Sequence, residues 1–164
     1  WNRIRTPLFR LPRGGCINFH PSPQPDYKSR AGYNTAILEK RRSFGVSAHF
    51  INSEAFDAGP IIAVKRFPMD PKRTNAHALE GLTQEHLYNL FEETMQRFLT
   101  SDRIRTRKNE GGLYLTSAQL EALKRVDLGH DSSELIDQKI RAFFFSTLWW
   151  RKNHGARPRL YPNQ

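Results

Sequence analysis

Three residues whose side chains can do chemistry together stand out in the chain: Asn18, His20 and Asp57. Asn18 and His20 lie two apart in a segment, Cys16 to His20, where β-branched and aromatic residues alternate with small or polar ones. This pattern predicts a short strand, which the prolines after His20 end. Residues two apart on a strand point to the same face, so the amide and the imidazole project together. Ligands of open α/β sheets bind at the C-terminal ends of strands, where this pair would lie.

An amide, an imidazole and a carboxylate together suit acyl transfer to an amine. An amide N–H can stabilise the oxyanion of a tetrahedral intermediate, and a histidine can accept the proton of the attacking nitrogen. A carboxylate can fix the tautomer of that histidine and raise its basicity. We therefore predict catalytic roles for Asn18, His20 and Asp57. The simpler alternative is that the asparagine and the histidine only satisfy backbone groups at a strand end.

The sequence around Asp57 predicts a pair of strands that present the carboxylate. Residues 45–51 and 60–67 both have the composition of strands, and the connection between them contains Asp57. We expect these strands to be antiparallel neighbours. A short helix is predicted before them, over residues 33–42.

Three further helices are predicted towards the C-terminus. Thr83 is the candidate N-cap of the first, because apolar residues at helical spacing follow it. The other two are expected over residues 117–126 and 133–145. Asp131 and Glu134 have the spacing of a capping box in front of the last helix.

Two motifs link the chain to a known family. The pattern Asn-x-His-Pro-Ser at 18–22, with Asp-x-Gly-Pro at 57–60, resembles the formyltransferases that use 10-formyltetrahydrofolate. A softer resemblance continues over 83–145 and includes the step Ile-Arg-Ala-Phe at 140–143. The resemblance implies an α/β fold with a Rossmann-like sheet. It also implies that the family's catalytic Asn, His and Asp correspond to Asn18, His20 and Asp57.

The resemblance implies a co-substrate and a place for it. In such enzymes the pterin of 10-formyltetrahydrofolate is held mostly by backbone groups of the loop before the catalytic aspartate. The corresponding residues here are Ile51, Asn52, Ser53, Ala55 and Phe56. Many family loops read Met-Asp-Glu-Gly in this region, and this chain departs from that pattern.

The first residues of the chain lead directly into the predicted catalytic strand. In the resembled family, the first strands and helices of the domain precede this point, so we expect the N-terminal part of the sheet to be missing here. We interpret residues 1–105 as the C-terminal portion of the catalytic core. Residues 106–164 are then a small helical and hairpin extension.

The loop after the catalytic strand indicates a subgroup of the family. It reads Asp26-Tyr27-Lys28-Ser29-Arg30, and Gly-Tyr-Asn then opens the next helix, which is closer to sugar formyltransferases than to the tRNA enzyme. Few residues remain after 145 for the β-barrel domain of methionyl-tRNA formyltransferase, and glycinamide ribonucleotide formyltransferase ends earlier. The implied acceptor is a nucleotide-linked amino sugar, such as a dTDP-4-amino-4,6-dideoxy sugar of lipopolysaccharide or O-antigen biosynthesis. Its expected contacts are Tyr27, Arg30 and Tyr33. A methionyl-tRNA enzyme, another family member and a deformylase remain alternatives.

The composition indicates in which cellular compartment the protein is found and whether it binds a membrane. The chain of 164 residues has one cysteine, which excludes an internal disulfide framework and fits a reducing cytoplasm. No apolar run approaches the length of a membrane span, and we expect no signal peptide. We therefore expect a cytoplasmic protein without a membrane partner, and the sequence leaves a homodimer open.

The sequence also raises the questions of a nucleic-acid-binding site and of a metal site. The net charge of +10 attracts phosphates of a small diphosphate or of nucleic acid. No nucleic-acid-binding motif accompanies the charge, so a basic nucleic-acid-binding protein is kept only as an alternative. Cys16, His20, His49 and Asp57 lack the spacing of zinc ligands, so no metal is predicted. His49 is interpreted as a core or loop histidine.

Overall fold

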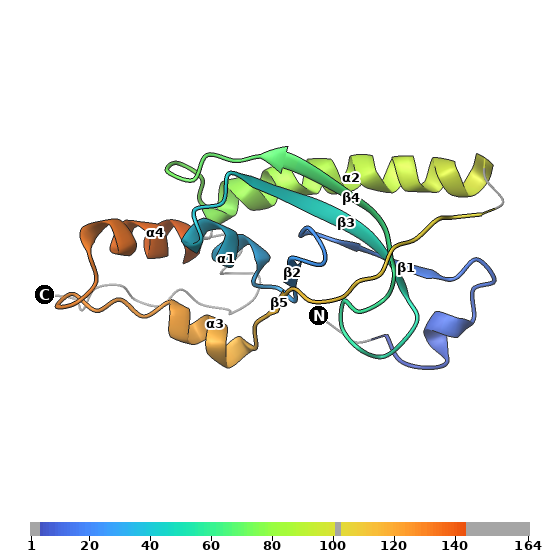
Figure 1. The fold of residues 1–164 in the computed structure, drawn as a ribbon, viewed down its shortest axis with the longest axis horizontal. Coiled ribbons are helices and arrows are strands. Elements are labelled where there is room, and N and C mark those ends of the chain that lie inside the picture. Colours follow the sequence, from blue (N-terminus) through green and yellow to red (C-terminus); the bar gives the residue numbers. More distant parts are fainter. Residues whose placement is uncertain (1–3, 101–102, 144–164) are drawn as a thin grey trace, which may run out of the picture.

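The computed structural model describes residues 4–100 and 103–143. Its centre is a three-stranded antiparallel sheet in the order β1-β3-β4, formed by β1 (Cys16–His20), β3 (Ser43–Ile51) and β4 (Ile61–Pro68). The long strands β3 and β4 cross the middle of the molecule, and β1 lies beside β3 (Figure 1). The predicted strands and their antiparallel pairing are confirmed.

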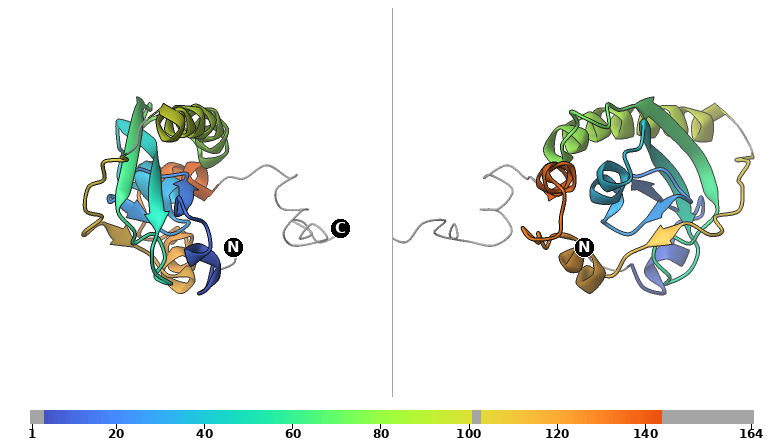
Figure 2. Two further views of the ribbon diagram at one scale, coloured as in Figure 1. Left: turned by 90° about the vertical axis from the view of Figure 1, so that its right-hand side faces the viewer. Right: turned by 60° about the vertical axis from the view of Figure 1, so that its left-hand side comes forward.

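Helix α2 (Ala76–Thr100) covers one face of this sheet (Figure 2). The Phe19 ring of β1 meets the Phe91 ring of α2 edge-on, with 5.3 Å between the ring centroids. Because side chains alternate along a strand, Asn18 and His20 then point to the other face of β1. The packing of Phe19 under α2 therefore turns the predicted catalytic pair away from the helix.

Smaller elements surround the sheet. The short helices α1 (Gly32–Leu38) and α4 (Ser133–Phe143) pack together, and Asn34 Nδ2 donates a hydrogen bond of 2.7 Å to the Ala142 carbonyl. A 3-10 helix and a third α-helix complete the described chain, η1 (Leu8–Arg10) and α3 (Ser117–Leu123). The described part of the predicted extension contains both of these helices, α3 and α4. Its division from the core at residue 105 stays a prediction, and residues 144–164 lie outside the described residues.

A long connection leads the chain from the end of α2 to the opposite face of the sheet. Residues 103–112, here called the strap, pass on the side of the sheet away from α2 (Figure 2). The strap leads into β5 (Leu113–Tyr114), which pairs in parallel with β2 (Tyr27–Lys28). Gly112 has a φ of +82°, and a Cβ atom there would lie 1.5 Å from the Pro25 carbonyl oxygen, so only glycine fits this crossing.

One predicted helix start and one predicted helix cap are wrong. Helix α2 begins seven residues before Thr83, at Ala76, because Asn75 Oδ1 accepts the backbone N–H of Ala78 and caps the helix. Thr83 is buried inside the helix, where its hydroxyl donates to the Leu79 carbonyl. At α4 the cap is Ser132, whose Oγ accepts the Leu135 N–H.

The reason for the second error is the environment of Asp131. Its carboxylate accepts hydrogen bonds from Lys139 Nζ and the Asp127 N–H instead of capping α4. A capping box does occur at α3, between Thr116 and Gln119. The predicted helix over 33–42 ends at Leu38, and Lys40 then adopts a φ of +53°.

No helix in the described residues is long and apolar enough to cross a membrane. Residues 4–100 and 103–143 also contain no group of three or more His, Cys, Asp or Glu side chains arranged to hold a metal ion.

Candidate active site

The three predicted catalytic residues converge beside the end of β1. Asn18 and His20 belong to β1, and Asp57 lies in the loop from β3 to β4. Asp57 adopts a φ of +50°, in the left-handed region that aspartate tolerates better than most residues. Gly59 packs so closely under this loop that a Cβ atom would lie 1.7 Å from the Phe50 carbonyl oxygen. The loop thus folds tightly back towards the sheet.

The carboxylate of Asp57 is held at both oxygens. Asp57 Oδ1 lies 3.5 Å from His20 Nδ1, an ion-pair distance that is longer than a hydrogen bond. Asp57 Oδ2 accepts a hydrogen bond of 2.8 Å from the backbone N–H of Ser29. His20 is buried, and its Nε2 has no hydrogen-bond partner in the described part of the chain. The other ring nitrogen, Nδ1, is the one that faces Asp57.

The surroundings of His20 and Asp57 lower the pKa values of both side chains. Burial lowers the pKa of His20 and outweighs the nearby charge of Asp57, which acts in the opposite direction. Burial alone would raise the pKa of Asp57, but contacts with His49, His20 and the Ser29 N–H outweigh it, so the net shift is downward. At neutral pH the site accordingly pairs a neutral imidazole with a carboxylate.

His49 is a fourth member of the cluster, although the sequence indicated only a core or loop histidine. It is buried on β3, directly opposite Asn18 in the strand register. His49 Nε2 lies 3.0 Å from Asn18 Nδ2 and 3.6 Å from Asp57 Oδ1. Its Nδ1 lies 2.9 Å from the Phe50 carbonyl oxygen, which can only accept, so Nδ1 carries the proton. In neutral His49, Nε2 then accepts from Asn18 and orients the amide.

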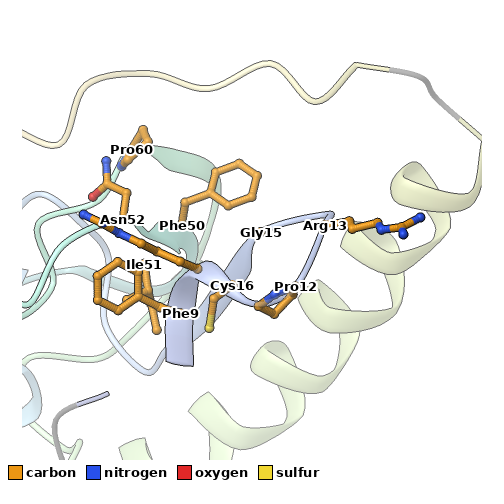
Figure 3. A pocket seen from close by; sticks show the side chains of 10 residues that line it. Phe9, Pro12, Arg13, Gly15, Cys16, Phe50, Ile51, Asn52 and Pro60 are labelled. Carbon is orange, nitrogen blue, oxygen red and sulfur yellow. The ribbon is translucent and has the colours of Figure 1, made fainter. Parts of the chain in front are cut away.

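Of the five residues expected to contact the pterin, two line a cavity and three do not. Ile51 and Asn52 line a cavity of about 390 Å³, which also contacts Cys16 at the start of β1 (Figure 3). Phe9 and Phe50 supply aromatic rings to the same cavity. The remaining expected contacts lie in the exposed part of the loop and are not among the lining residues: Ser53, Ala55 and Phe56.

The residues expected to contact the acceptor differ in accessibility and in their neighbours. Tyr27 is buried, and its hydroxyl donates to Glu39 Oε2 at 2.6 Å. Burial and this carboxylate raise the pKa of Tyr27 to about 12. Tyr33 is half-buried and packs against another aromatic ring of the core. Arg30 is exposed and follows Ser29, the residue that holds Asp57. Their roles in acceptor binding stay predictions.

Comparisons with known proteins agree with the motifs. The family model described as "Formyl transferase" matches residues 3–94. The methionyl-tRNA formyltransferase of Lysinibacillus sphaericus is 26% identical over 131 residues, covering 80% of this chain and 41% of that protein. The phosphoribosylglycinamide formyltransferase of Haemophilus influenzae is 32% identical over 108 residues, covering 65% of this chain and 50% of that protein.

A solved structure supports the same grouping. The N-formyltransferase of Helicobacter canadensis, in complex with folinic acid and dTDP-3-aminofucose, has a TM-score of 0.69 and 26% identity, covering 79% of this chain and 48% of that one. The chain spans about half the length of the curated relatives it matches. The sequence motifs, the α/β fold and the family match agree, and the chain belongs to the formyl transferase family.

Proposed function

We propose that the protein is a cytoplasmic N-formyltransferase, which moves a formyl group from 10-formyltetrahydrofolate to the amine of a nucleotide-linked amino sugar. The observation that carries the proposal is the convergence of Asn18, His20 and Asp57 beside the end of β1. The cavity lined by Ile51 and Asn52 offers aromatic and backbone surface of the kind that a pterin ring needs.

The proposed chemistry assigns one role to each side chain. Asn18 donates an amide N–H to the oxyanion that develops when the acceptor amine attacks the formyl carbon. His20 Nε2 accepts the proton that the attacking nitrogen loses. Asp57 orients His20 and stabilises the imidazolium, and His49 holds the Asn18 amide in the donating orientation. The bond from the formyl carbon to the folate nitrogen then breaks, and that nitrogen takes up the proton held by His20, which releases tetrahydrofolate and restores the neutral base.

Two observations bear on the acceptor and point in different directions. The Helicobacter canadensis enzyme, whose structure resembles this chain, is bound to a dTDP-linked amino sugar. Curated relatives include methionyl-tRNA formyltransferases. We favour the amino sugar because the Tyr27 to Asn34 segment resembles sugar enzymes, and methionyl-tRNA is the second candidate. The link to lipopolysaccharide or O-antigen biosynthesis, and a homodimer, stay predictions.

Mass spectrometry tests the function directly. The protein is incubated with 10-formyltetrahydrofolate and, in separate reactions, with dTDP-amino sugars, methionyl-tRNA or buffer alone. We expect one formyl group to be added to an amino sugar. Formylation of methionyl-tRNA alone would select the second candidate, and release of formate in buffer would indicate a deformylase. No product in any reaction would reject the proposed function.

The pH profile of the reaction follows from the state of His20. Neutral His20 is the base, so activity is lost as the pH falls through its pKa. Because burial holds that pKa below the ordinary 6.5, the acid limb of kcat/KM should lie below pH 6.5. Asp57→Asn removes a charge that raises the pKa of His20 and should shift the limb to still lower pH. An acid limb that Asp57→Asn leaves unmoved would contradict the assignment of His20 as the base.

A further inference from the structure

Asn109, in the middle of the strap, reaches the loop that carries Asp57. Its side-chain Nδ2 lies 2.9 Å from the Asp57 carbonyl oxygen, 2.9 Å from the Gly59 carbonyl oxygen and 2.8 Å from Gln24 Oε1. The two backbone oxygens can only accept hydrogen bonds, so the orientation of the Asn109 amide is fixed with its NH₂ group towards the loop. Asn109 is itself 8% exposed.

The loop needs a donor at this place. The left-handed conformation of Asp57 and the close packing of Gly59 against Phe50 direct two carbonyl groups of the turn towards the strap. A buried carbonyl without a donor destabilises the fold. Asn109 satisfies both carbonyls, and the same turn sets the position from which the Asp57 side chain reaches His20 and His49.

The strap is fixed on both sides of the contact. Arg107 exchanges two backbone hydrogen bonds with Ile61, of 2.8 and 2.9 Å, at the start of β4. Lys28 Nζ donates to the Asn109 carbonyl oxygen at 3.2 Å. Asn109 is therefore held by contacts with β2 at its own carbonyl and with β4 two residues earlier.

We propose that Asn109 is a positioning residue, which holds the Asp57 carboxylate beside His20 and His49 by binding the backbone of the Asp57 turn. Its effect on catalysis rests on the proposed function, but its effect on the geometry of Asp57 does not. The readout for geometry is the Ser29 backbone N–H, which donates to Asp57 Oδ2 only while the carboxylate stays in place.

Two substitutions separate donation from shape. Asn109→Ala removes the amide, and Asn109→Asp keeps its shape but puts an oxygen against three oxygens. We expect both variants to lose hydrogen-exchange protection at the Ser29 amide in NMR spectra. Their kcat should fall about tenfold to hundredfold with nearly unchanged KM values, because a small displacement of a catalytic group affects the reaction more than binding.

The matched control is Arg107→Met. It removes another side-chain hydrogen bond of the strap, from Arg107 to the Gln24 carbonyl oxygen at 3.3 Å. It does not change Asn109 or any residue of the Asp57 turn. We expect Ser29 protection and kcat of this variant to match the wild type. If Asn109→Asp behaves like Arg107→Met, the positioning role is rejected. It is also rejected if both Asn109 variants fail to fold, because Asn109 would then support the whole fold.

The two proposals fail in different ways. A wild-type protein that formylates no acceptor rejects the proposed function, while loss of Ser29 protection in the Asn109 variants still supports the positioning role. An active wild type whose Asn109 variants keep both kcat and Ser29 protection leaves the function standing and rejects the positioning role.

Discussion

Asn18→Ala should lower kcat by about a hundredfold or more, since the loss of one oxyanion donor typically costs 10²–10³ in kcat. Asn18 is the middle residue of β1, and its Nδ2 lies 3.0 Å from His49 Nε2. The substitution removes no backbone group of the β1–β3 pairing. The measurement is steady-state formyl transfer, with circular dichroism to confirm folding.

Asn18→Asp is the control that separates donation from size. It keeps the shape of the side chain but has no N–H to donate, so its kcat should be at least as low as that of Asn18→Ala. A folded Asn18→Ala protein with nearly wild-type kcat would show that Asn18 does not stabilise the oxyanion.

His20→Ala and Asp57→Ala should behave as one unit. Each single substitution is expected to lower kcat by about 10²–10⁴, the range of general acid–base catalysis. The double variant should be little worse than the poorer single one, because an orienting carboxylate has no function once its base is absent. The 3.5 Å separation of His20 Nδ1 and Asp57 Oδ1 is the physical reason for this coupling.

A double-mutant cycle measured on kcat tests this coupling. Losses that multiply across the two sites would mean that His20 and Asp57 act separately. His49→Gln is a useful third variant because His49 also contacts Asp57. If Asp57 acted mainly through His49, the Asp57→Ala loss would vanish in the His49→Gln background.

The sequence predicted those parts of the site whose structure depends on neighbouring residues in the chain. Alternation and the following prolines predicted β1 and the common face of Asn18 and His20, and two strand-like segments predicted the loop of Asp57. Thr83 was assigned wrongly because a threonine before an apolar stripe has the composition of a cap. The capping hydrogen bond is made by Asn75, which directly precedes the first residue of α2.

The missed members of the site depend on contacts distant in sequence. His49 meets Asn18 only because β1 and β3 pair in one particular register, which places the two residues opposite each other. Asn109 is 52 residues from Asp57, and nothing in its neighbouring sequence indicates that its amide faces the Asp57 turn. Such contacts follow from topology, which local periodicity does not specify.

The route of the strap also has a consequence for the order of folding. Asn109 meets Gln24 across 85 residues, and the parallel pair β2–β5 joins equally remote segments. Closing so large a loop costs entropy before any contact compensates it, so such pairings form slowly. We expect refolding protein to regain its helical signal first and formyl transfer later, when the strap docks. Catalytic competence would then report the completed topology and not merely the collapsed chain.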